Sequence, residues 1–283
     1  MLLSIRLQTY NHQEFIEQAL QGIEDQITNF NFEVVIGDDF STDNNVKLIK
    51  KFISNSKNSK IEYRLLDRKE GDAYWKQRQK KGRLYNFINI LENCKGKYIA
   101  LLDGDDYWTG PLKLQKQVDF LEANEGFSGC FHDTLILNET QSDSILKAWR
   151  VYDKDIFKLE DTISTTALCH TSSFMFKKSD FYLPTWFTKV QSGDMALFAL
   201  VASNGKLYRV NEFMSVYRKN EAGLTNFISL KDYHKNRIKL NLYYKESFGV
   251  NTHEKIDEVI NYHNSELIKL KRWFDKIKDL FKL

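Results

Sequence analysis

The chain has 283 residues, of which 42% are hydrophobic and 28% charged, a composition that excludes a disordered protein. Its formal net charge of +3, from 41 basic and 38 acidic residues, gives no reason to expect a nucleic acid as partner. The three scattered cysteines argue against a disulfide framework, and neither a signal peptide nor a stretch of about 18 apolar residues is present. We expect a globular protein of the cytoplasm.

Apolar spacing along the first ~125 residues predicts alternating strands and helices. The segment from Arg68 to Arg83 interrupts this pattern, because it is polar and basic, and it predicts a mobile loop. Beyond residue 126 the pattern is weaker, with strands near 127–137 and 207–210 and a helix over 194–203. In the first part, the predicted strands are 2–8, 32–36, 61–66 and 97–102, and the predicted helices are 16–27, 46–53, 84–91 and 111–121.

Such alternation favours an α/β fold, with a mostly parallel sheet and helices on both faces. In sheets of this kind ligands gather at the carboxyl ends of the strands. Two of the predicted strands end in acidic pairs, at Asp38-Asp39 and at Asp105-Asp106. Negative charge is therefore predicted at the edge where a ligand would bind.

An acidic turn, Asp103-Gly-Asp-Asp106, follows the predicted strand 97–102. Carboxylates so close together repel one another unless a cation binds between them. Mg²⁺ and Mn²⁺ prefer oxygen ligands of this kind. The alternative is that Asp-Gly only makes a turn. The same alternative applies to Asp38 and Asp39, although the Ser41-Thr-Asp43 cluster behind them is typical of a nucleotide pocket.

Several of these segments, taken in order, resemble family 2 glycosyltransferases. The resemblance covers roughly residues 1–225. The matching pieces are Thr9-Tyr-Asn11, Gly37-Asp-Asp-Phe-Ser-Thr-Asp43, Gly96-Lys-Tyr-Ile-Ala-Leu-Leu-Asp-Gly-Asp-Asp-Tyr-Trp108, Gly193-Asp194 and Tyr217-Arg218.

The resemblance implies a GT-A fold and inverting transfer from a nucleoside-diphosphate sugar, most often a UDP-sugar. It implies a nucleoside site at Thr9 and Asn11, a base contact at Asp39 with Asp38 beside it, and a general base at Asp194. The implied donor-site residues are Thr9, Asn11, Asp38, Asp39, Asn86, Asp103, Gly104 and Arg218, and the implied ligands of Mn²⁺ or Mg²⁺ are Asp103 and Asp105.

Some of these positions admit other interpretations. Asp194 opens a predicted helix and is also suited to capping it, while Asn86 also fits a solvated helix face. Where many relatives have Tyr-Arg-x-His, this chain has Tyr217-Arg-Lys-Asn220, so His12 and His170 are candidates for the missing histidine. Tyr107 and Trp108 suit either an acceptor-sugar platform or the core.

Residues 226–283 are predicted to form a helical C-terminal extension to a catalytic domain of residues 1–225. In its last part, 265–283, apolar residues at three-four spacing alternate with many lysines, which predicts a basic amphipathic helix. Such a helix suits peripheral contact with the inner face of the cell membrane, packing on the catalytic domain, or pairing with a second copy.

The predicted function is metal-dependent transfer of a sugar to a glycan or glycolipid acceptor in surface polysaccharide biosynthesis. The first alternative is a non-catalytic nucleotide- or carbohydrate-binding protein that retains the pocket. The second is a nucleotidyltransferase, which the absence of a glycine-rich, arginine-containing loop after the first strand disfavours.

Overall fold

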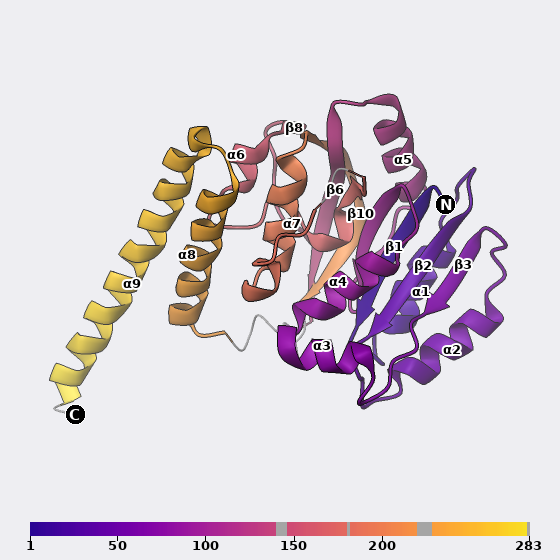
Figure 1. The fold of residues 1–283 in the computed structure, drawn as a ribbon, viewed down its shortest axis with the longest axis horizontal. Helices are drawn as coiled ribbons and strands as arrows, with labels where there is room; N and C mark the ends of the chain where they lie inside the picture. The colour runs from indigo at the N-terminus through magenta and orange to yellow at the C-terminus, as the bar shows by residue number, and fades with distance from the viewer. Residues whose placement is uncertain (140–145, 180–181, 220–227, 282–283) are drawn as a thin grey trace.

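The computed structural model describes residues 1–139, 146–179, 182–219 and 228–281, and it is built around one mixed sheet (Figure 1). In the described part of the chain this sheet has ten strands, in the order β3-β2-β1-β4-β9-β6-β10-β5, with β7 beside β6 and β8 beside β10. The strands are β1 Leu3–Thr9, β2 Phe32–Asp38, β3 Ile61–Leu65, β4 Tyr98–Asp103, β5 Tyr107–Trp108, β6 Phe127–Asn138, β7 Lys147–Ala148, β8 Ile156–Phe157, β9 Met175–Lys177 and β10 Lys206–Lys219.

The first four strands are parallel, as the sequence predicts. β1 lies between β2 and β4, with Thr9 opposite Asp38 and Gln8 opposite Asp103. β2 and β4 bury nearly every residue, which explains why both are rich in apolar side chains, although β2 also buries Glu33. Their carboxyl ends meet at one edge, so the two acidic segments lie on either side of the end of β1.

The second half of the sheet is mixed. β9 runs antiparallel to both β4 and β6, while β10 runs parallel to β6 with three register shifts. β5, directly after the acidic turn, pairs antiparallel with β10. The expected short strand at 207–210 is therefore part of a longer one, which carries Arg218 back to the acidic turn.

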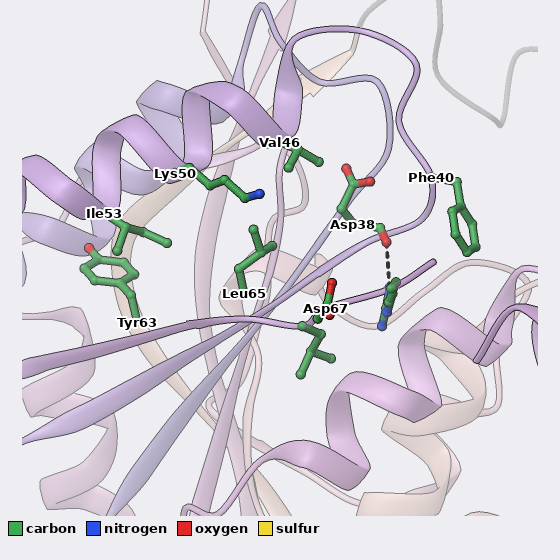
Figure 2. A pocket seen from close by; sticks show the side chains of 10 residues that line it. Asp38, Phe40, Val46, Lys50, Ile53, Tyr63, Leu65 and Asp67 are labelled. Carbon is green, nitrogen blue, oxygen red and sulfur yellow. Dashed lines mark hydrogen bonds between the residues drawn. The ribbon is translucent and has the colours of Figure 1, made fainter. Parts of the chain in front are cut away.

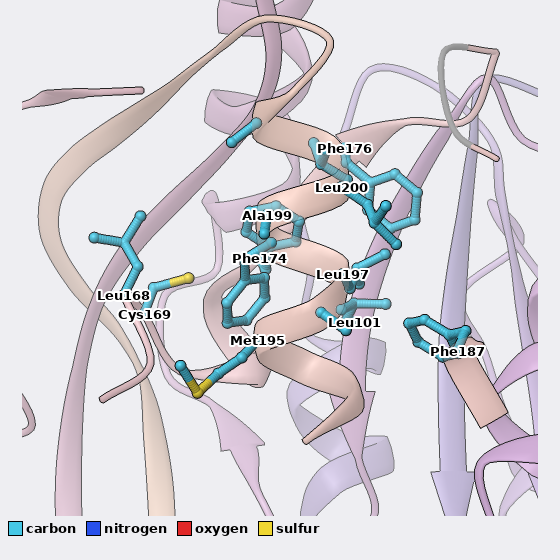
Figure 3. Close-up of a cluster of buried hydrophobic side chains, with 14 of the residues drawn as sticks. Leu101, Leu168, Cys169, Phe174, Phe176, Phe187, Met195, Leu197, Ala199 and Leu200 are labelled. Atoms are coloured by element: carbon cyan, nitrogen blue, oxygen red, sulfur yellow. The ribbon is translucent and has the colours of Figure 1, made fainter. Parts of the chain in front are cut away.

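Helices cover both faces of the sheet. α1, α2 and α5 pack on one face around side chains of the parallel strands such as Ile5 and Ala100, whereas α4, α7 and α8 pack on the other around Leu101 and Phe131. Figure 3 shows α7 at the centre of the second cluster, with Phe174 and Leu197 among its side chains. The helices are α1 Ile16–Glu24, α2 Asn45–Asn55, α3 Ala73–Lys81, α4 Leu84–Asn93, α5 Lys113–Ala123, α6 Leu159–Thr162, α7 Gly193–Ala202, α8 Leu230–Ser247 and α9 His253–Phe281, with 3-10 turns at Thr171–Ser173, Phe187–Lys189 and Val250–Thr252.

The prediction of a mobile loop over 68–83 is wrong for most of that segment, because residues 73–81 form α3. The Asp72 side chain caps this helix by accepting a hydrogen bond from the Trp75 backbone N–H. Tyr74 is buried and anchors the helix to the body. The sequence did not predict this helix because the segment is basic and its apolar residues do not recur at helical spacing.

The C-terminal residues form a helical hairpin of α8 and α9, which Figure 1 shows at the end of the molecule away from β3. Leu240 and Tyr244 on α8 and Ile256 on α9 join the same apolar cluster as α7. The predicted helix over 265–283 is present to Phe281, while residues 282–283, and side chains from 274 onward, lie outside the described part. Among the described helices none has the length and apolar character needed to cross a membrane.

Candidate active site

The acidic turn is packed tightly against the end of β1. The backbone N–H of Gly104 donates to Gln8 O at 2.9 Å, and that of Asp106 donates to Asp103 O at 3.1 Å. A Cβ on Gly104 would lie 2.7 Å from Thr9 Oγ1, closer than real side chains approach. Glycine is therefore required here, because the turn and β1 leave no room for a side chain.

Asp103 rests on a buried guanidinium. Arg6, in the middle of β1, is 1% exposed, and its Nη2 lies 2.9 Å from Asp103 Oδ1. Burial raises the pKa of Asp103, and the Arg6 charge opposes that rise. This ion pair fixes the orientation of Asp103, one of the two predicted metal ligands.

Asp105 and Asp106 have different surroundings. Asp105 is partly exposed, and its Oδ2 lies 3.8 Å from His12 Nε2. Asp106 is buried and accepts a hydrogen bond from the Arg218 backbone N–H at 3.0 Å, and burial raises its pKa well above the usual range. Asp106 therefore points into the protein, and the two carboxylates of the turn that reach the surface are those of Asp103 and Asp105.

The pair fits a divalent cation that is shared with phosphates. Asp103 and Asp105 are 26% and 23% exposed, so both carboxylates remain accessible beside each other. Across the residues that the structure describes, no three histidine, cysteine or carboxylate side chains converge into a complete cage. Mg²⁺ in phosphate sites takes only one or two protein carboxylates, and substrate and water supply the rest.

Arg218 is held in the wall of this site. Its Nε donates to Asp105 O at 3.0 Å, and its terminal nitrogens bond the side chains of Glu139 and Gln18. The guanidinium also lies 5.2 Å from the centre of the Tyr107 ring. Arg218 thus fixes the backbone of the acidic turn, and it is 7% exposed, which leaves little of it open to a phosphate.

The acidic pair after β2 has hydrogen-bond partners of its own. The Asp38 carboxylate accepts hydrogen bonds from Asn45 Nδ2 at 2.8 Å and from the Ser41 backbone N–H at 2.8 Å. The side chain of Asp39 instead accepts from residues of α3. Asp38 and Asp103 lie two strands apart, about 10 Å in a parallel sheet, so the two acidic segments occupy different parts of one sheet edge and do not share a cation.

Thr9 and Asn11 tie the end of β1 to the loop after β2. Thr9 is buried, its hydroxyl accepts from Asn45 Nδ2 at 3.0 Å, and its carbonyl oxygen accepts from the Asp39 backbone N–H at 3.0 Å, so it supports the loop after β2 from inside the protein. Asn11 has a positive φ of 52°, and its Oδ1 accepts from the Thr42 backbone N–H at 2.8 Å. The exposed Asn11 backbone turn is where a nucleoside could be contacted.

Asn86 lies beneath the end of β2 and is buried, which excludes the solvated helix face. Its Oδ1 accepts from Arg68 Nη1 at 2.7 Å, and its Nδ2 donates to Gly37 O at 3.2 Å. Arg68 Nη1 also donates to Asp38 O at 2.8 Å. Asn86 and Arg68 together support the loop after β2 from the α4 side of the sheet.

A cavity of about 440 Å³ opens beside this loop, between α2 and β3 (Figure 2). Its lining includes Asp38 and Phe40 at the end of β2 and Arg68 in the segment after β3. Lys50 of α2 extends into it (Figure 2). The volume falls in the range of about 300–1,000 Å³ that is usual for small-molecule sites. The cavity therefore adds binding space at the same sheet edge.

Asp194 lies in the first turn of α7, with Ser192 as the N-terminal flanking residue, so it is not the capping residue. Its charge interacts with that of Asp103. The N-terminus of α7 abuts that of α4: Arg83 Nη2 donates to Gln191 O at 2.6 Å, and a Cβ on Gly193 would lie 2.8 Å from Leu84 Cδ2. This contact holds Asp194 near the acidic turn.

Comparison with known proteins decides the family. The model of glycosyl transferase family 2 matches residues 4–182. The chain belongs to this family. An uncharacterized protein of Mycobacterium tuberculosis (strain H37Rv) is 31% identical over 227 residues, which cover 78% of this chain and 60% of that protein. The chain thus spans about three fifths of the length of this relative.

A second relative has a stated reaction. The UDP-Glc:alpha-D-GlcNAc-diphosphoundecaprenol beta-1,3-glucosyltransferase WfaP of Escherichia coli is 32% identical over 126 residues, which cover 44% of this family 2 chain and 43% of WfaP.

Solved structures confirm the predicted GT-A fold. Residues 1–349 of Staphylococcus aureus TarS in complex with UDP-GlcNAc superimpose with a TM-score of 0.64 at 15% identity, over 95% of this chain and 72% of that one. The mannosyltransferase PcManGT of Pyrobaculum calidifontis, in complex with GDP-Man and Mn²⁺, gives a TM-score of 0.61 at 14% identity, over 92% of this family 2 chain and 69% of that one.

Within this fold the aromatic and histidine candidates separate. Trp108 is buried, and its Nε1 donates to Ser172 O at 2.8 Å, so it belongs to the core, and Tyr107 is half-buried beside Arg218. Burial lowers the pKa of His170 to about 3, and its ring stacks on Tyr217 at 4.4 Å. His12 beside Asp105 is thus the histidine nearer the predicted cation. Asn220 lies outside the described residues.

Sequence reasoning did not identify Arg6, which pairs with Asp103, or Tyr74 and Arg78 of α3, which bind Asp39. For Arg6 a signal existed, because a charged residue in the middle of a buried strand needs a partner. Its partner lies 97 residues further along the chain, and only the register of β1 against β4 brings the two together.

Proposed function

We propose that this chain is a metal-dependent, inverting glycosyltransferase that uses a nucleoside-diphosphate sugar of the UDP class. Its acceptor is a glycan or a lipid-linked glycan of surface polysaccharide biosynthesis. The observation that carries the proposal is the acidic turn after β4, where Asp103 and Asp105 share one strand end above the buried Arg6. Membership of family 2 supports the reaction class.

Asp194 is the general base of the proposed reaction. Transfer forms a bond from an acceptor oxygen to the anomeric carbon and breaks the bond from that carbon to a phosphate oxygen, so the acceptor hydroxyl must release a proton. Asp194 accepts this proton. Its position in the first turn of α7, held against the start of α4, supports the role because this end of the helix lies near the acidic turn.

Asp103 and Asp105 would hold Mn²⁺ or Mg²⁺. When bound, the cation supplies positive charge that stabilises the departing diphosphate. Arg6 keeps the Asp103 carboxylate oriented, and Arg218 holds the backbone of the turn, so both act by positioning. The Mn²⁺ in the PcManGT complex supports metal dependence.

The donor preference has two supports. TarS was solved with UDP-GlcNAc, and the name of the E. coli relative specifies UDP-Glc. The sheet edge between the Asn11 turn, Asp39 and the cavity beside Asp38 offers the nucleoside a site.

The acceptor proposal extends to a membrane surface. The E. coli relative is named for a diphosphoundecaprenol-linked substrate. His234 and His263 touch at 2.8 Å across the antiparallel hairpin, so α9 residues beyond about 267 pass the start of α8. There Ile268 and Trp273 are 53% and 57% exposed, next to Lys269, Lys271 and Arg272. Exposed apolar groups with cations suit anionic headgroups at the inner face of the cell membrane.

The central test is a panel of sugar nucleotides, incubated with and without Mn²⁺, in which release of the nucleoside diphosphate is measured. We expect Mn²⁺-dependent UDP release by the wild type. Asp105→Asn should lose Mn²⁺-dependent donor binding, while Asp194→Asn should bind donor normally and lose about a hundredfold or more in turnover. Asp153→Asn, an exposed carboxylate far along the chain, is the control.

The outcomes distinguish the alternatives. Donor binding without turnover by the wild type favours a binding protein, and pyrophosphate as product favours a nucleotidyltransferase. Sedimentation with phosphatidylglycerol vesicles, but not with phosphatidylcholine vesicles, tests the membrane proposal, and it should weaken in Lys271→Glu. A dimer in solution that ignores both vesicles argues for protein pairing instead.

A further inference from the structure

The carboxylate of Asp39 is held by α3. Tyr74 Oη donates to Asp39 Oδ1 at 2.8 Å. Arg78 Nε donates to Oδ1 at 3.0 Å and to Oδ2 at 2.8 Å, and Arg78 Nη2 lies 2.8 Å from Oδ2. The Asp39 side chain is 11% exposed, so these contacts determine which way the carboxylate faces.

Its backbone is fixed as well. The Asp39 N–H donates to Thr9 O at 3.0 Å, so both the main chain and the side chain of Asp39 are anchored. The next residue, Phe40, has a positive φ of 65°, which turns the chain sharply away after Asp39. The carboxylate therefore stays at the sheet edge while the chain departs toward α2.

Tyr74 is itself locked in a stack. The Arg68 guanidinium lies 3.7 Å from the centre of the Tyr74 ring on one side, and the Tyr85 ring stacks at 5.5 Å. Arg68 is fixed in turn by Asn86 and by Asn89, whose Oδ1 accepts from Nη2 at 2.9 Å. Burial raises the pKa of Tyr74, so its hydroxyl stays protonated and remains a donor.

The contacts with α3 leave the Asp39 carboxylate able to accept a further hydrogen bond. An ionised carboxylate has about four acceptor positions and no donor. Three donors make the four contacts given above, because the Arg78 Nε–H is shared between the two oxygens. Three donor protons therefore occupy the carboxylate, and capacity for one more remains. A group that can only accept selects a base edge that donates, such as N3–H of uracil or N1–H of guanine. The N3 of cytosine is itself an acceptor and would be repelled.

We infer that Tyr74 and Arg78 are positioning residues for base selection: they orient Asp39 so that its remaining acceptor position contacts an N–H of the donor nucleobase. The inference rests on the proposed function and on the base contact that the family resemblance implies at Asp39. It adds that α3, a segment outside the matching motifs, sets how strictly the enzyme separates uridine from cytidine nucleotides.

The test is calorimetric titration of UDP and of CDP, both with Mn²⁺, into the wild type and four variants. Tyr74→Phe removes one charge-assisted hydrogen bond, and we expect UDP affinity to fall about fivefold to tenfold while CDP affinity stays unchanged. Arg78→Gln should lower UDP affinity by about tenfold or more. The UDP affinity of Arg78→Lys should lie between those of the wild type and Arg78→Gln, because lysine keeps the charge but lacks the planar guanidinium.

Tyr85→Phe is the matched control. It removes a hydroxyl from the ring stacked on Tyr74 without touching Asp39, so its UDP-to-CDP ratio should stay within about twofold of the wild type. If Tyr74 and Arg78 only anchored α3, their substitution would change stability and would lower the affinities for UDP and CDP together. The ratio of the two affinities therefore separates base selection from a structural role.

Each remaining outcome is decisive. If the wild type prefers UDP while Tyr74→Phe and Arg78→Gln keep its ratio, the inference is overturned and the proposed function stands. If the wild type binds neither nucleotide, the proposed donor class fails, and the inference fails with it. If Arg78→Gln does not fold, Tyr74→Phe, which retains the stacked ring, carries the test.

Discussion

Replacing Arg6 by methionine tests how the acidic turn is kept stable. In the wild type the buried Arg6 guanidinium lies 2.9 Å from Asp103, whose charge also meets that of Asp105. Methionine keeps an unbranched apolar stem and removes the cation. Asp103 then faces like charge with no counterion, and we expect the folded state to lose stability.

The size of the loss follows from burial. Breaking a fully buried ion pair costs about 3–5 kcal/mol. The loss should be smaller here, because Asp103 is 26% exposed. In addition, Arg6 Nε and Nη1 have no hydrogen-bond partner among the described residues, so removing the guanidinium also removes the desolvation cost of two unpaired donors. A net loss of about 2 kcal/mol is expected, or roughly 3–4 °C in Tm for a chain of 283 residues.

Manganese should reverse part of this loss. If Asp103 and Asp105 hold a cation, Mn²⁺ replaces the missing charge, so it should raise the Tm of Arg6→Met more than that of the wild type. Thermal unfolding in EDTA and in Mn²⁺ measures both effects. Arg209→Met is the control, because Arg209 forms a buried pair with Asp133 at 2.7 Å away from the turn and should lose stability without rescue. Equal Mn²⁺ shifts in wild type and Arg6→Met would refute the reasoning.

Three further predictions concern packing and pH. Gly104→Ala places a Cβ 2.7 Å from Thr9 Oγ1, so it should cost about 1–3 kcal/mol in thermal unfolding and weaken UDP binding. Burial lowers the pKa of Lys113 to about 7, below its unfolded value of about 10.4, so wild-type stability should rise from pH 7 toward pH 10, and in Lys113→Met that slope should vanish in urea titrations. Burial beside His234 lowers the pKa of His263 to about 4, so stability should fall by on the order of 2 kcal/mol as the pH drops from about 6.5 to about 4, and His263→Gln should flatten that fall.

The parallel half of the sheet could be predicted from local pattern. β2 and β4 are rich in apolar residues and end in Asp38 and Asp103, and this composition reveals the strands because helices cover both of their faces. The acidic turn could be predicted for the same reason, since a carboxylate cluster directly after a buried strand has few purely structural uses.

Other features were hidden from local pattern. α3 has almost no apolar spacing, and its helix depends on the contacts of Tyr74 and Arg78 with the body. Trp108 and Tyr107 are adjacent in the chain, yet one is core and the other faces Arg218, because β5 pairs with β10 in one register only. Periodicity carries no information about such long-range pairing.

By itself, the sequence determined the α/β alternation, the strand ends that carry acidic residues, and the family, because each depends on residues that are neighbours in the chain. Only the tertiary structure decided which carboxylates stay available: Arg6 underlies Asp103, Arg218 fixes the turn, and α3 holds Asp39. The physical reason is that the ionisation and orientation of a carboxylate depend on the charges and donors within a few ångströms of it, and folding brings those from distant parts of the chain.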